Sequence, residues 1–254
     1  MRDLVLSEIG KLSFRPKKWL GQNFTVDRRI IDYFVSNIER STEVIEIGTG
    51  LGTLTLALAE ISKRVITIER DERLCNYLKR KLEKVSNVTL ICGDALEYPF
   101  NKPWVVGSIP YSISGPLLAK LSTSSTWEKS LLLLQKDFVD RITARPGSKD
   151  YGRLSVMVQL CCEIEKGPVW PPNSFWPRPQ VLSQHVHLKR LESVPEEFSK
   201  FLACLFSQKN KKLRKVARSC GFEWDDDRRV REVEPKEFLR VFERVWKSID
   251  LIGP

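Results

Sequence analysis

The sequence predicts an α/β fold, in which a parallel sheet carries helices on both faces and a small helical domain follows. Between residues 43 and 134, short runs of β-branched and aliphatic residues alternate with stretches in which leucines recur at helical spacing. This alternation is typical of parallel sheets whose strands are joined by helices. After about residue 191 only helical spacing remains. The 254 residues suffice for one large and one small domain, which we place at residues 1–190 and 191–254.

Each element of the predicted sheet domain follows from a local pattern. Asp27 is expected to cap a first helix, whose apolar face includes Ile31 and Phe34. The expected parallel strands are residues 44–47, 65–68, 88–91, 104–109 and 131–134. The helices between the first three strands are predicted from leucines at helical spacing, and Asp71 is the expected cap of the second of these helices.

Later in the chain the alternation stops. A polar, glycine-containing loop is expected at residues 145–153, and the pattern of residues 153–160 fits a helix or a strand. Residues 162–170 and 181–188 are expected to be strands that finish the sheet as an antiparallel hairpin, joined by a proline-rich segment. Apolar stripes at helical spacing then predict the helical domain, whose last helix is expected to begin near Pro235.

The charge of the chain indicates a polyanionic partner. Its 42 Lys and Arg residues exceed its 32 Asp and Glu residues, which gives a formal net charge of +10 and an isoelectric point of about 9.4. This balance favours RNA or DNA over an acidic small molecule, although solubility alone is an alternative explanation. The first residues lack the apolar core of a signal peptide, and no apolar run reaches membrane-spanning length. We therefore expect a soluble, cytoplasmic monomer with no membrane partner.

The cysteines and histidines do not predict a metal site. None of the six cysteines belongs to a CxxC pair, and Cys161 and Cys162 are adjacent. We expect all six to be small core residues in a reducing compartment. His185 and His187 alternate along an expected strand without an apparent third ligand, so we expect ordinary strand residues there and no metal.

A glycine-rich turn, Gly48-Thr-Gly50-Leu-Gly52, follows the first expected strand and lets the backbone approach a ligand closely. Glu69 ends the second strand, 21 residues after Gly48 (69 − 48), where a carboxylate can accept both ribose hydroxyls of a nucleoside. Asp94 ends the third strand and can accept from an adenine amine. A tight turn, a surface ion pair and a helix cap explain these features singly. Their shared place at the carboxyl ends of parallel strands favours a nucleoside-binding site.

Ser108-Ile-Pro-Tyr111 follows the fourth expected strand. The Ser108 side chain and the Ile109 carbonyl can both face an amine on a flat ring, and Tyr111 offers a face for stacking. Pro110 has no N–H and restricts Ile109 to an extended conformation. Taken alone, the stretch is better explained as an ordinary exit from a strand. Combined with the glycine turn and the two carboxylates, it favours S-adenosylmethionine over NAD as the cofactor and an amino group as the methyl acceptor.

Several stretches together carry a resemblance to a known family. They are Leu20–Phe24, Glu46–Gly50, Glu69, Gly93–Ala95, Ser108–Tyr111, Gln135-Lys136, Pro146–Ser155 and Phe175–Val181. Through them almost the whole chain resembles the KsgA/RsmA-type rRNA adenine N6,N6-dimethyltransferases, with the macrolide-resistance (Erm) methylases as cousins. The resemblance implies a Rossmann-like, S-adenosylmethionine-dependent methyltransferase domain.

The resemblance and the motifs also imply roles for single residues. The expected donor-binding residues are Gln22, Asn23, Thr25, Gly48, Gly50, Glu69, Asp94, Ala95 and Ser108. The expected catalytic residues are Ser108, Ile109, Pro110, Tyr111 and Phe175, of which Tyr111 and Phe175 would lie against the target adenine. The implied substrate is a pair of adjacent adenosines in a hairpin loop near the 3′ end of small-subunit rRNA.

Ser108 departs from the family, which has Asn at this position. Serine has a shorter reach and a single hydroxyl with which to hold the hydrogens of the target amine. The loss of one transition-state acceptor costs about 3 kcal/mol, or about a hundredfold in rate. We therefore expect slower or less complete dimethylation than in a relative with Asn.

Three basic clusters are candidates for RNA contact. One lies between residues 206 and 218 and contains no acidic residue, another includes Lys17, Lys18, Arg28 and Arg29, and the third lies on the polar loop. The residues expected to bind RNA are Arg145, Lys149, Arg153, Lys209, Lys211, Lys212, Arg214 and Lys215. A solvated surface is the alternative for each cluster, but the net charge and the resemblance favour phosphate contacts for the first and third.

The predicted function is methyl transfer from S-adenosylmethionine to N6 of adenosine in small-subunit rRNA, with a role in small-subunit biogenesis. An alternative is a ribosome-assembly factor that binds immature small subunits and methylates weakly or not at all, which only Ser108 supports. A nicotinamide oxidoreductase fits the glycine turn but leaves Ser108–Tyr111 and Phe175 unexplained.

Overall fold

The computed structural model describes residues 1–11, 16 and 21–250, which fold into two compact units. The first unit contains Met1–Leu117, Thr126–Val139 and Ile164–Lys189. The second contains Leu118–Ser125, Asp140–Glu163 and Arg190–Pro254. The last segment of the second unit begins at Arg190, next to the expected domain boundary at residue 191. The second unit also contains two earlier segments that we expected in the sheet domain. Leu20, Lys17 and Lys18 lie outside the described residues.

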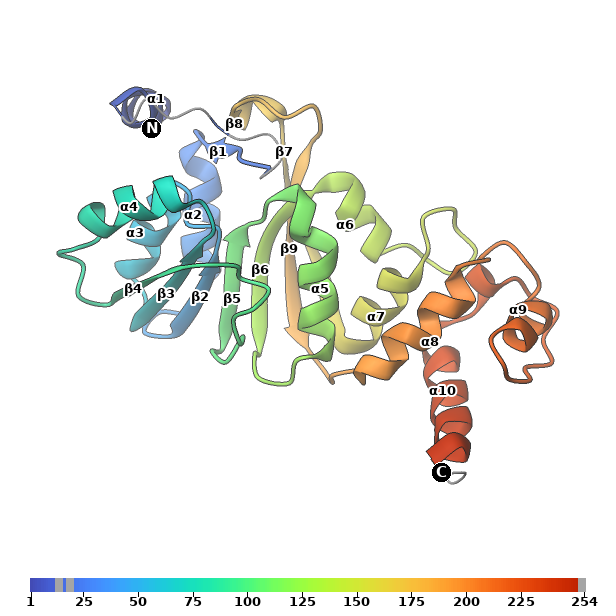
Figure 1. Ribbon diagram of the computed structural model, residues 1–254. Coiled ribbons are helices and arrows are strands. Elements are labelled where there is room, and N and C mark those ends of the chain that lie inside the picture. Colours follow the sequence, from blue (N-terminus) through green and yellow to red (C-terminus); the bar gives the residue numbers. More distant parts are fainter. Residues whose placement is uncertain (12–15, 17–20, 251–254) are drawn as a thin grey trace. The chain divides into compact units, whose positions relative to one another are not determined.

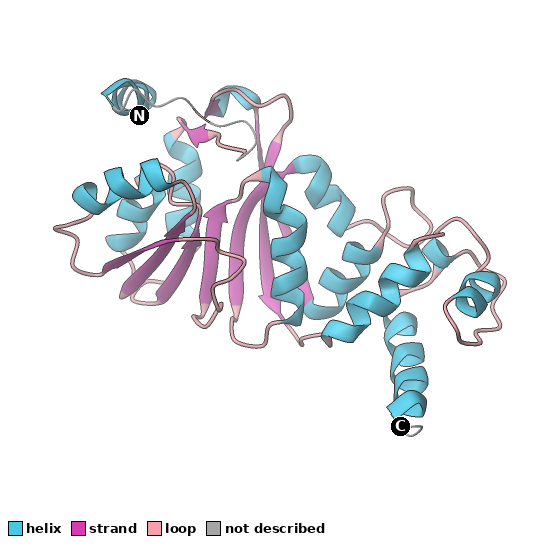
Figure 2. Ribbon diagram, in the orientation of Figure 1, coloured by secondary structure: helices cyan, strands magenta, loops and turns pink. Residues whose placement is uncertain are grey.

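A seven-stranded sheet is the central feature of the fold (Figures 1 and 2), with the strand order β4-β3-β2-β5-β6-β9-β7. The strands are β2 (Glu43–Ile47), β3 (Arg64–Glu69), β4 (Val88–Cys92), β5 (Trp104–Ser108), β6 (Lys129–Gln135), β7 (Cys162–Trp170) and β9 (Ser183–Arg190). Neighbours from β4 to β6 run parallel, and β9 is antiparallel to β6. The expected parallel strands are therefore confirmed, and the two late strands complete one edge.

Helices precede, connect and follow the strands. They are α1 (Arg2–Lys11), α2 (Arg28–Ser36), α3 (Thr53–Ala59), α4 (Glu72–Lys81), η2 (Tyr111–Ile113), α5 (Ser114–Thr123) and α6 (Lys136–Ile142). Among them, α2, α3 and α4 are the ones that the sequence pattern predicts. Both expected caps are confirmed. The Asp27 carboxylate accepts the Arg29 N–H at 3.1 Å, and the Asp71 carboxylate accepts the Arg73 N–H at 3.0 Å.

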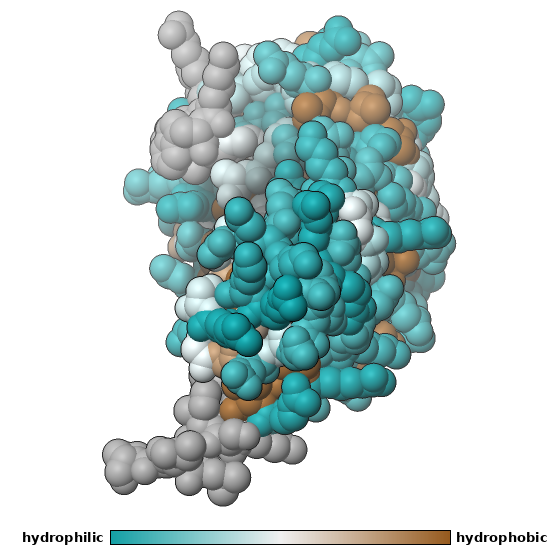
Figure 3. All heavy atoms as spheres, turned by 90° about the vertical axis from the view of Figure 1, so that its right-hand side faces the viewer, coloured by the Kyte–Doolittle hydropathy of each residue, from teal (hydrophilic) through white to brown (hydrophobic). Residues whose placement is uncertain are grey.

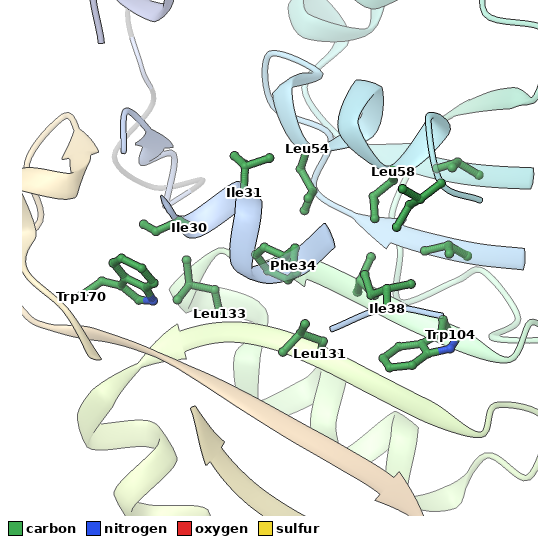
Figure 4. Close-up of a cluster of buried hydrophobic side chains, with 14 of the residues drawn as sticks. Ile30, Ile31, Phe34, Ile38, Leu54, Leu58, Trp104, Leu131, Leu133 and Trp170 are labelled. Atoms are coloured by element: carbon green, nitrogen blue, oxygen red, sulfur yellow. The ribbon is translucent and has the colours of Figure 1, made fainter. Parts of the chain in front are cut away.

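Both faces of the central strands of the sheet, β2, β3, β5 and β6, are buried. Phe34 of α2 and Leu58 of α3 pack against one face, in a cluster that includes Leu131 of β6 (Figure 4). Residues that alternate with this row, such as Ile45 and Leu132, point to the other face and are also fully buried. Burial on both faces explains why these strands occur in the sequence as nearly continuous apolar runs.

A two-stranded antiparallel sheet joins the start of the chain to the residues after β7. In it, β1 (Phe24–Thr25) pairs with β8 (Phe175–Trp176), so that Thr25 lies opposite Phe175. Nearby, Val26 donates its N–H to the Ser174 carbonyl at 2.9 Å. The sequence predicts only a proline-rich connection here; the structure instead places β8, preceded by the single turn η3 (Pro172–Ser174), beside the N-terminal motif.

The second unit is helical around an aromatic core. Its elements are α7 (Arg153–Cys161), α8 (Glu196–Phe206), α9 (Leu213–Ser219), η4 (Val230–Glu232) and α10 (Pro235–Asp250). Residues 153–160, which fit either structure by pattern, are therefore helical. Phe198 of α8 and Phe238 of α10 are fully buried beside Tyr151, whose hydroxyl donates to the Val233 carbonyl at 2.9 Å. Among the described helices, none is both long and apolar enough to cross a membrane.

The cysteine expectation is wrong for four of the six cysteines, all of which lie in the described residues. The structure pairs Cys75 with Cys92 and Cys204 with Cys220, across sequence separations of 17 and 16 residues. The Cα atoms of the two pairs are 5.9 and 6.0 Å apart, within the range that a disulfide requires. Cysteines this far apart in the sequence pair only because the fold brings their elements together, and a search for CxxC spacing does not detect such pairs. Cys161 and Cys162 are buried and unbridged, as expected.

Candidate active site

A cleft in the first unit opens at the carboxyl ends of β2, β3, β4 and β5. It encloses about 1290 Å³, including space that is open to solvent. Its lining includes Gly21–Thr25, Gly48–Leu51, Glu69, Gly93–Ala95, Ser108–Ile113 and Phe175. Every residue predicted to hold the donor or the target base therefore lines one cleft. Those that follow β2 to β5 meet there because parallel strands end at the same edge of the sheet, and the β1–β8 pair brings in the others.

The turn after β2, residues 48–52, forms a backbone cradle that we call the glycine loop. Gly48 has φ of +81°, a conformation that side-chain-bearing residues rarely adopt. A Cβ atom at this position would also lie 3.6 Å from the Ser108 carbonyl oxygen and from Pro110. The absence of a side chain at Gly48 leaves room for a ligand to contact the backbone between the ends of β2 and β5.

Glu69 is nearly buried, with 7% of its surface exposed, and each carboxylate oxygen accepts one backbone N–H. One oxygen accepts from Gly50 at 2.9 Å and the other from Asp71 at 2.8 Å. Burial raises the pKa of Glu69, and these N–H donors oppose the rise. Because each carboxylate oxygen has two lone pairs, both oxygens can still accept a hydroxyl. Glu69 therefore fits the ribose of a nucleoside donor.

Glu46 is a cleft residue that the sequence reasoning missed. It lies on β2, is 1% exposed, and accepts hydroxyl hydrogen bonds from Thr55 and Thr67, each at 2.6 Å. Its other oxygen, Oε1, has no hydrogen-bond partner among the described residues. Burial raises the pKa of Glu46 to about 7 despite the two hydroxyl donors. The sequence did contain a sign of it, because this acidic residue stands between the apolar residues Ile45 and Ile47.

Asp94 acts in part as the helix cap that its position suggests, and it also forms an ion pair. One carboxylate oxygen accepts the Leu96 N–H at 2.9 Å, as a cap would, and the other lies 3.3 Å from an Arg70 nitrogen. The side chain is 24% exposed, so lone pairs remain available on the cleft side. Ala95 beside it is buried, which favours a flat apolar ring such as adenine.

The N-terminal segment is fastened to the cleft by side chains. The Gln22 amide donates to Asp71 at 2.9 Å and provides this link, whereas the Asn23 amide donates to the Gly21 carbonyl at 3.2 Å within the segment itself. Burial opposes the ionisation of Asp71, but hydrogen bonds from Arg73 and Gln22 lower its pKa to about 2. The structure thus places Gln22 as a fastener of this segment, whereas the resemblance assigns it to the donor.

The stretch after β5 leaves the sheet in an extended conformation. The Ile109 N–H continues the ladder by donating to the Leu133 carbonyl at 3.1 Å, and Pro110 has φ of −55° and ψ of 131°. Before this stretch, Gly107 passes so close to β2 that a Cβ atom would lie 2.4 Å from the Ile47 carbonyl oxygen. This close approach brings Ser108 to the same cleft as the glycine loop.

Tyr111 and Phe175 are the aromatic residues expected to hold the base. The Tyr111 hydroxyl lies 3.1 Å from the Ser183 hydroxyl, and burial raises the Tyr111 pKa. Phe175 lines the cleft but is only 3% exposed and packs into the cluster beneath α2. Tyr111 is therefore the more accessible of the two surfaces for stacking, and Phe175 supports the cleft from the core.

Comparison with known proteins identifies the family. The family model for ribosomal RNA adenine dimethylase matches residues 13–246. The chain belongs to this family. It is 38% identical over 259 residues to the ribosomal RNA small subunit methyltransferase A of Thermotoga maritima, an alignment that covers 98% of this chain and 92% of the relative.

Solved structures agree with this identification of the dimethylase. A dimethyladenosine transferase from Plasmodium falciparum matches with a TM-score of 0.76 and 26% identity, covering 88% of this chain and 98% of that one. The 23S rRNA methyltransferase ErmE matches with a TM-score of 0.64 and 25% identity, covering 87% and 99%. The predicted family, the Rossmann-like methyltransferase fold and the enzyme class are confirmed.

The predicted RNA-binding residues of the dimethylase lie in the second unit, in adjoining loops and at the starts of α7 and α9. Gly147 donates its N–H to the Arg231 carbonyl at 2.7 Å, and the Lys209 amine donates to the Lys149 carbonyl at 2.8 Å. The loop of residues 145–153 is therefore joined to the segments on either side of α9. Figure 3 shows that the face bearing α9 is mainly hydrophilic, and Arg145, Lys149 and Arg153 are exposed.

These basic residues are not equivalent. Lys212 and Arg214 both pair with Asp227, at 3.2 and 3.1 Å, which partly neutralises them. Lys209 is engaged by backbone carbonyls. Lys211 and Lys215 are exposed and form no ion pair with another described residue. Phosphate attraction is therefore concentrated on fewer residues than the sequence suggests.

The histidines belong to an aromatic cluster under α2. His185 is fully buried, accepts the Trp170 indole N–H at 2.8 Å, and burial lowers its pKa to about 3. His187 lies 2.8 Å from the Tyr33 hydroxyl. In the part of the chain that the structure describes, they do not join any group of metal-ligating side chains.

Proposed function

We propose that this dimethylase transfers methyl groups from S-adenosylmethionine to N6 of adjacent adenosines in a hairpin loop near the 3′ end of small-subunit rRNA, two methyl groups per base. The observation that carries the proposal is the single cleft that unites the glycine loop, the carboxylates of Glu69 and Asp94, and the Ser108–Tyr111 stretch. The Thermotoga maritima relative bears the name of a small-subunit rRNA methyltransferase.

The residues of the cleft fit the methyl donor. Glu69 retains lone pairs for the ribose hydroxyls, and Asp94 retains them for the adenine amine. The glycine loop admits a ligand to its backbone. When bound, S-adenosylmethionine supplies an electrophilic methyl group on a sulfonium centre.

The acceptor side rests on Ser108, Ile109 and Tyr111. The Ser108 hydroxyl and the Ile109 carbonyl would accept the two hydrogens of the adenine amine, which favours a pyramidal, nucleophilic nitrogen. Tyr111 would stack on the ring after the base leaves its helix or loop. Catalysis then consists mainly of holding the nitrogen, the methyl carbon and the sulfur in line.

RNA affinity would come from the second unit. Exposed Arg145, Lys149, Arg153, Lys211 and Lys215 would contact phosphates, which gives salt-dependent binding with little sequence choice. Selection of the adenosines would come from the cleft. The net charge of +10 supports a polyanionic partner for the chain as a whole.

The decisive experiment is mass spectrometry of rRNA. Purified protein is incubated with isotopically labelled S-adenosylmethionine and with small ribosomal subunits from cells that lack the modification. Labelled N6,N6-dimethyladenosine at two adjacent positions is the expected product, and Tyr111→Ala is expected to reduce it strongly. Donor consumption without any methylated adenosine would contradict the proposal.

We also propose that the substrate is an immature small subunit in the cytoplasm and that the enzyme acts as a monomer. Sedimentation with ribosomal particles of different maturity tests the preference for immature subunits, and light scattering of the purified enzyme tests whether it is a monomer. Family membership favours catalysis over the alternative of an assembly factor without methylation and over a nicotinamide oxidoreductase. Equal methylation of mature and immature subunits would contradict the preference for immature ones.

A further inference from the structure

The outer side of the glycine loop is held by two residues that no sequence motif singles out. Lys81, at the end of α4, donates to the Leu51 carbonyl at 2.8 Å and to both carboxylate oxygens of Glu8, on α1, at 2.8 and 2.9 Å. An ammonium group has three donors, so these bonds use its full capacity. The Lys81 side chain is 19% exposed and that of Glu8 33% exposed, so the pair is partly shielded from water.

The glycine loop is fastened from both sides at neighbouring residues. Gly50 donates its N–H to Glu69 on the cleft side, whereas Leu51, the next residue, gives its carbonyl to Lys81 on the outer side. The Leu51 side chain is 3% exposed and packs in one apolar cluster with Val5 of α1. Both the backbone and the side chain of Leu51 are thus fixed by α1 and α4.

We infer that Lys81 and Glu8 are positioning residues for the methyl donor, which makes the N-terminal helix a functional part of the donor site. The inference rests on the proposed function, because the donor is what the glycine loop is expected to hold. Neither residue belongs to the described lining of the cleft, so both act through Leu51. A loop rich in glycine has little conformational preference of its own, and a charge-assisted hydrogen bond from outside fixes where its peptide groups lie.

A purely structural role in attaching α1 is the competing explanation. It predicts a lower melting temperature for variants, with donor binding unchanged at temperatures where the protein is folded. The positioning role predicts a higher KM for S-adenosylmethionine with little change in kcat at saturating donor. The two explanations are therefore separated by kinetics measured well below the melting temperature.

Lys81→Met removes the ammonium and keeps most of the aliphatic stem, which lies 3.9 Å from the position of a Cβ atom at Gly52. We expect the donor KM to rise about tenfold, because a hydrogen bond to a charged group corresponds to about that factor in affinity. Lys81→Arg keeps the charge and is expected to restore part of the loss. Lys79→Met, at an exposed position in the same helix, is the matched control and is expected to leave the KM unchanged.

Glu8→Gln keeps the Lys81–Leu51 bond but removes the partner charge, so a smaller rise in donor KM is expected. It also serves as the test if Lys81→Met does not fold. Calorimetric titration of the wild type with S-adenosylmethionine checks the proposed function separately, and a wild type that does not bind the donor overturns both. Donor binding by the wild type together with unchanged KM values in Lys81→Met, or in Glu8→Gln if Lys81→Met does not fold, overturns this inference alone.

Discussion

Replacement of Glu46 by Gln is expected to remove a pH dependence of stability that originates in the buried end of β2. Burial raises the pKa of this carboxyl group from 4.5 to about 7. When a carboxyl group has a higher pKa in the folded than in the unfolded state, the folded state binds more protons at pH values between the two pKa values. The unfolding free energy therefore falls as the pH rises through that range. The difference between 4.5 and about 7 corresponds to about 3 kcal/mol of unfolding free energy at pH values above 7.

Gln is a suitable neutral replacement because its amide oxygen can still accept from Thr55 and Thr67. The assay is urea denaturation without donor at pH values from about 4.5 to 8. Relative to Glu46→Gln, the wild type is expected to lose about 3 kcal/mol of unfolding free energy across this range. His185, with a pKa lowered to about 3, acts in the opposite direction below pH 6.5, but it is present in both proteins and cancels in the difference. Parallel pH profiles for the two proteins would refute this account of Glu46.

Three further predictions concern catalysis, RNA binding and the disulfides. Ser108→Asn is expected to raise the rate of dimethylation by up to about a hundredfold, because Asn reaches further as an acceptor; equal rates and product ratios in a parallel methylation assay would contradict it. Replacement of Lys211 and Lys215 by Ala is expected to lower the salt slope of RNA binding by about two, since each phosphate that is no longer neutralised reduces the slope by about 0.7–0.9, and an unchanged slope would exclude both residues from phosphate binding. Replacement of Cys204 and Cys220 by Ser is expected to reduce the unfolding free energy by about 3 kcal/mol, since the bridge spans 16 residues; an equal denaturation midpoint under oxidising conditions would show that the bridge does not stabilise the protein.

The strands and helices of the sheet could be predicted because their determinants are local. Asp27 and Asp71 precede their helices as caps, and the strands appear as apolar runs because both of their faces are buried. The β1–β8 pair could not be predicted in the same way. Each strand has two residues, and the partners Thr25 and Phe175 are 150 residues apart (175 − 25), so their pairing is decided only when the fold is complete.

The candidate site was predictable to the extent that its residues stand at the ends of strands. Glu69 and Asp94 follow this rule, and the topology alone brings them to one cleft. Lys81 was not predictable, because its function depends on a carbonyl 30 residues away. Its sequence context, a basic last turn of a helix, is typical of many helices and indicates no ligand. Gln22 is among the residues predicted to bind the donor, but its amide donates a hydrogen bond to Asp71. The sequence does not specify this orientation of the side chain.

The hydrogen bonds around β3 imply that the carboxylates of this site have a structural role in addition to ligand binding. Glu69 accepts from Gly50 in the glycine loop and from Asp71, and Asp71 in turn accepts from Gln22 in the N-terminal segment. The glycine loop and the N-terminal segment are therefore both held by two acidic residues of one turn. In Glu69→Gln, one of the two carboxylate oxygens becomes an NH2 group, which cannot accept a backbone N–H. Part of any loss of donor affinity in this variant would therefore come from displacement of the glycine loop.

Asp71 offers a way to separate these two contributions. Asp71→Asn weakens the fastening of Gln22 and leaves the Glu69 carboxylate in place, so its effect on donor affinity measures the contribution of the N-terminal segment together with that of the α4 cap. Because hydrogen bonds from Arg73 and Gln22 lower the pKa of Asp71 to about 2, the stability that it contributes is present above its usual pKa of 3.8 and is lost only as the pH falls toward 2. The fastening therefore stays ionised throughout the range in which Glu46 titrates. A pH dependence of donor affinity between about 4.5 and 7 that disappears in Glu46→Gln would thus originate in the buried end of β2 and not in the attachment of the N-terminal segment.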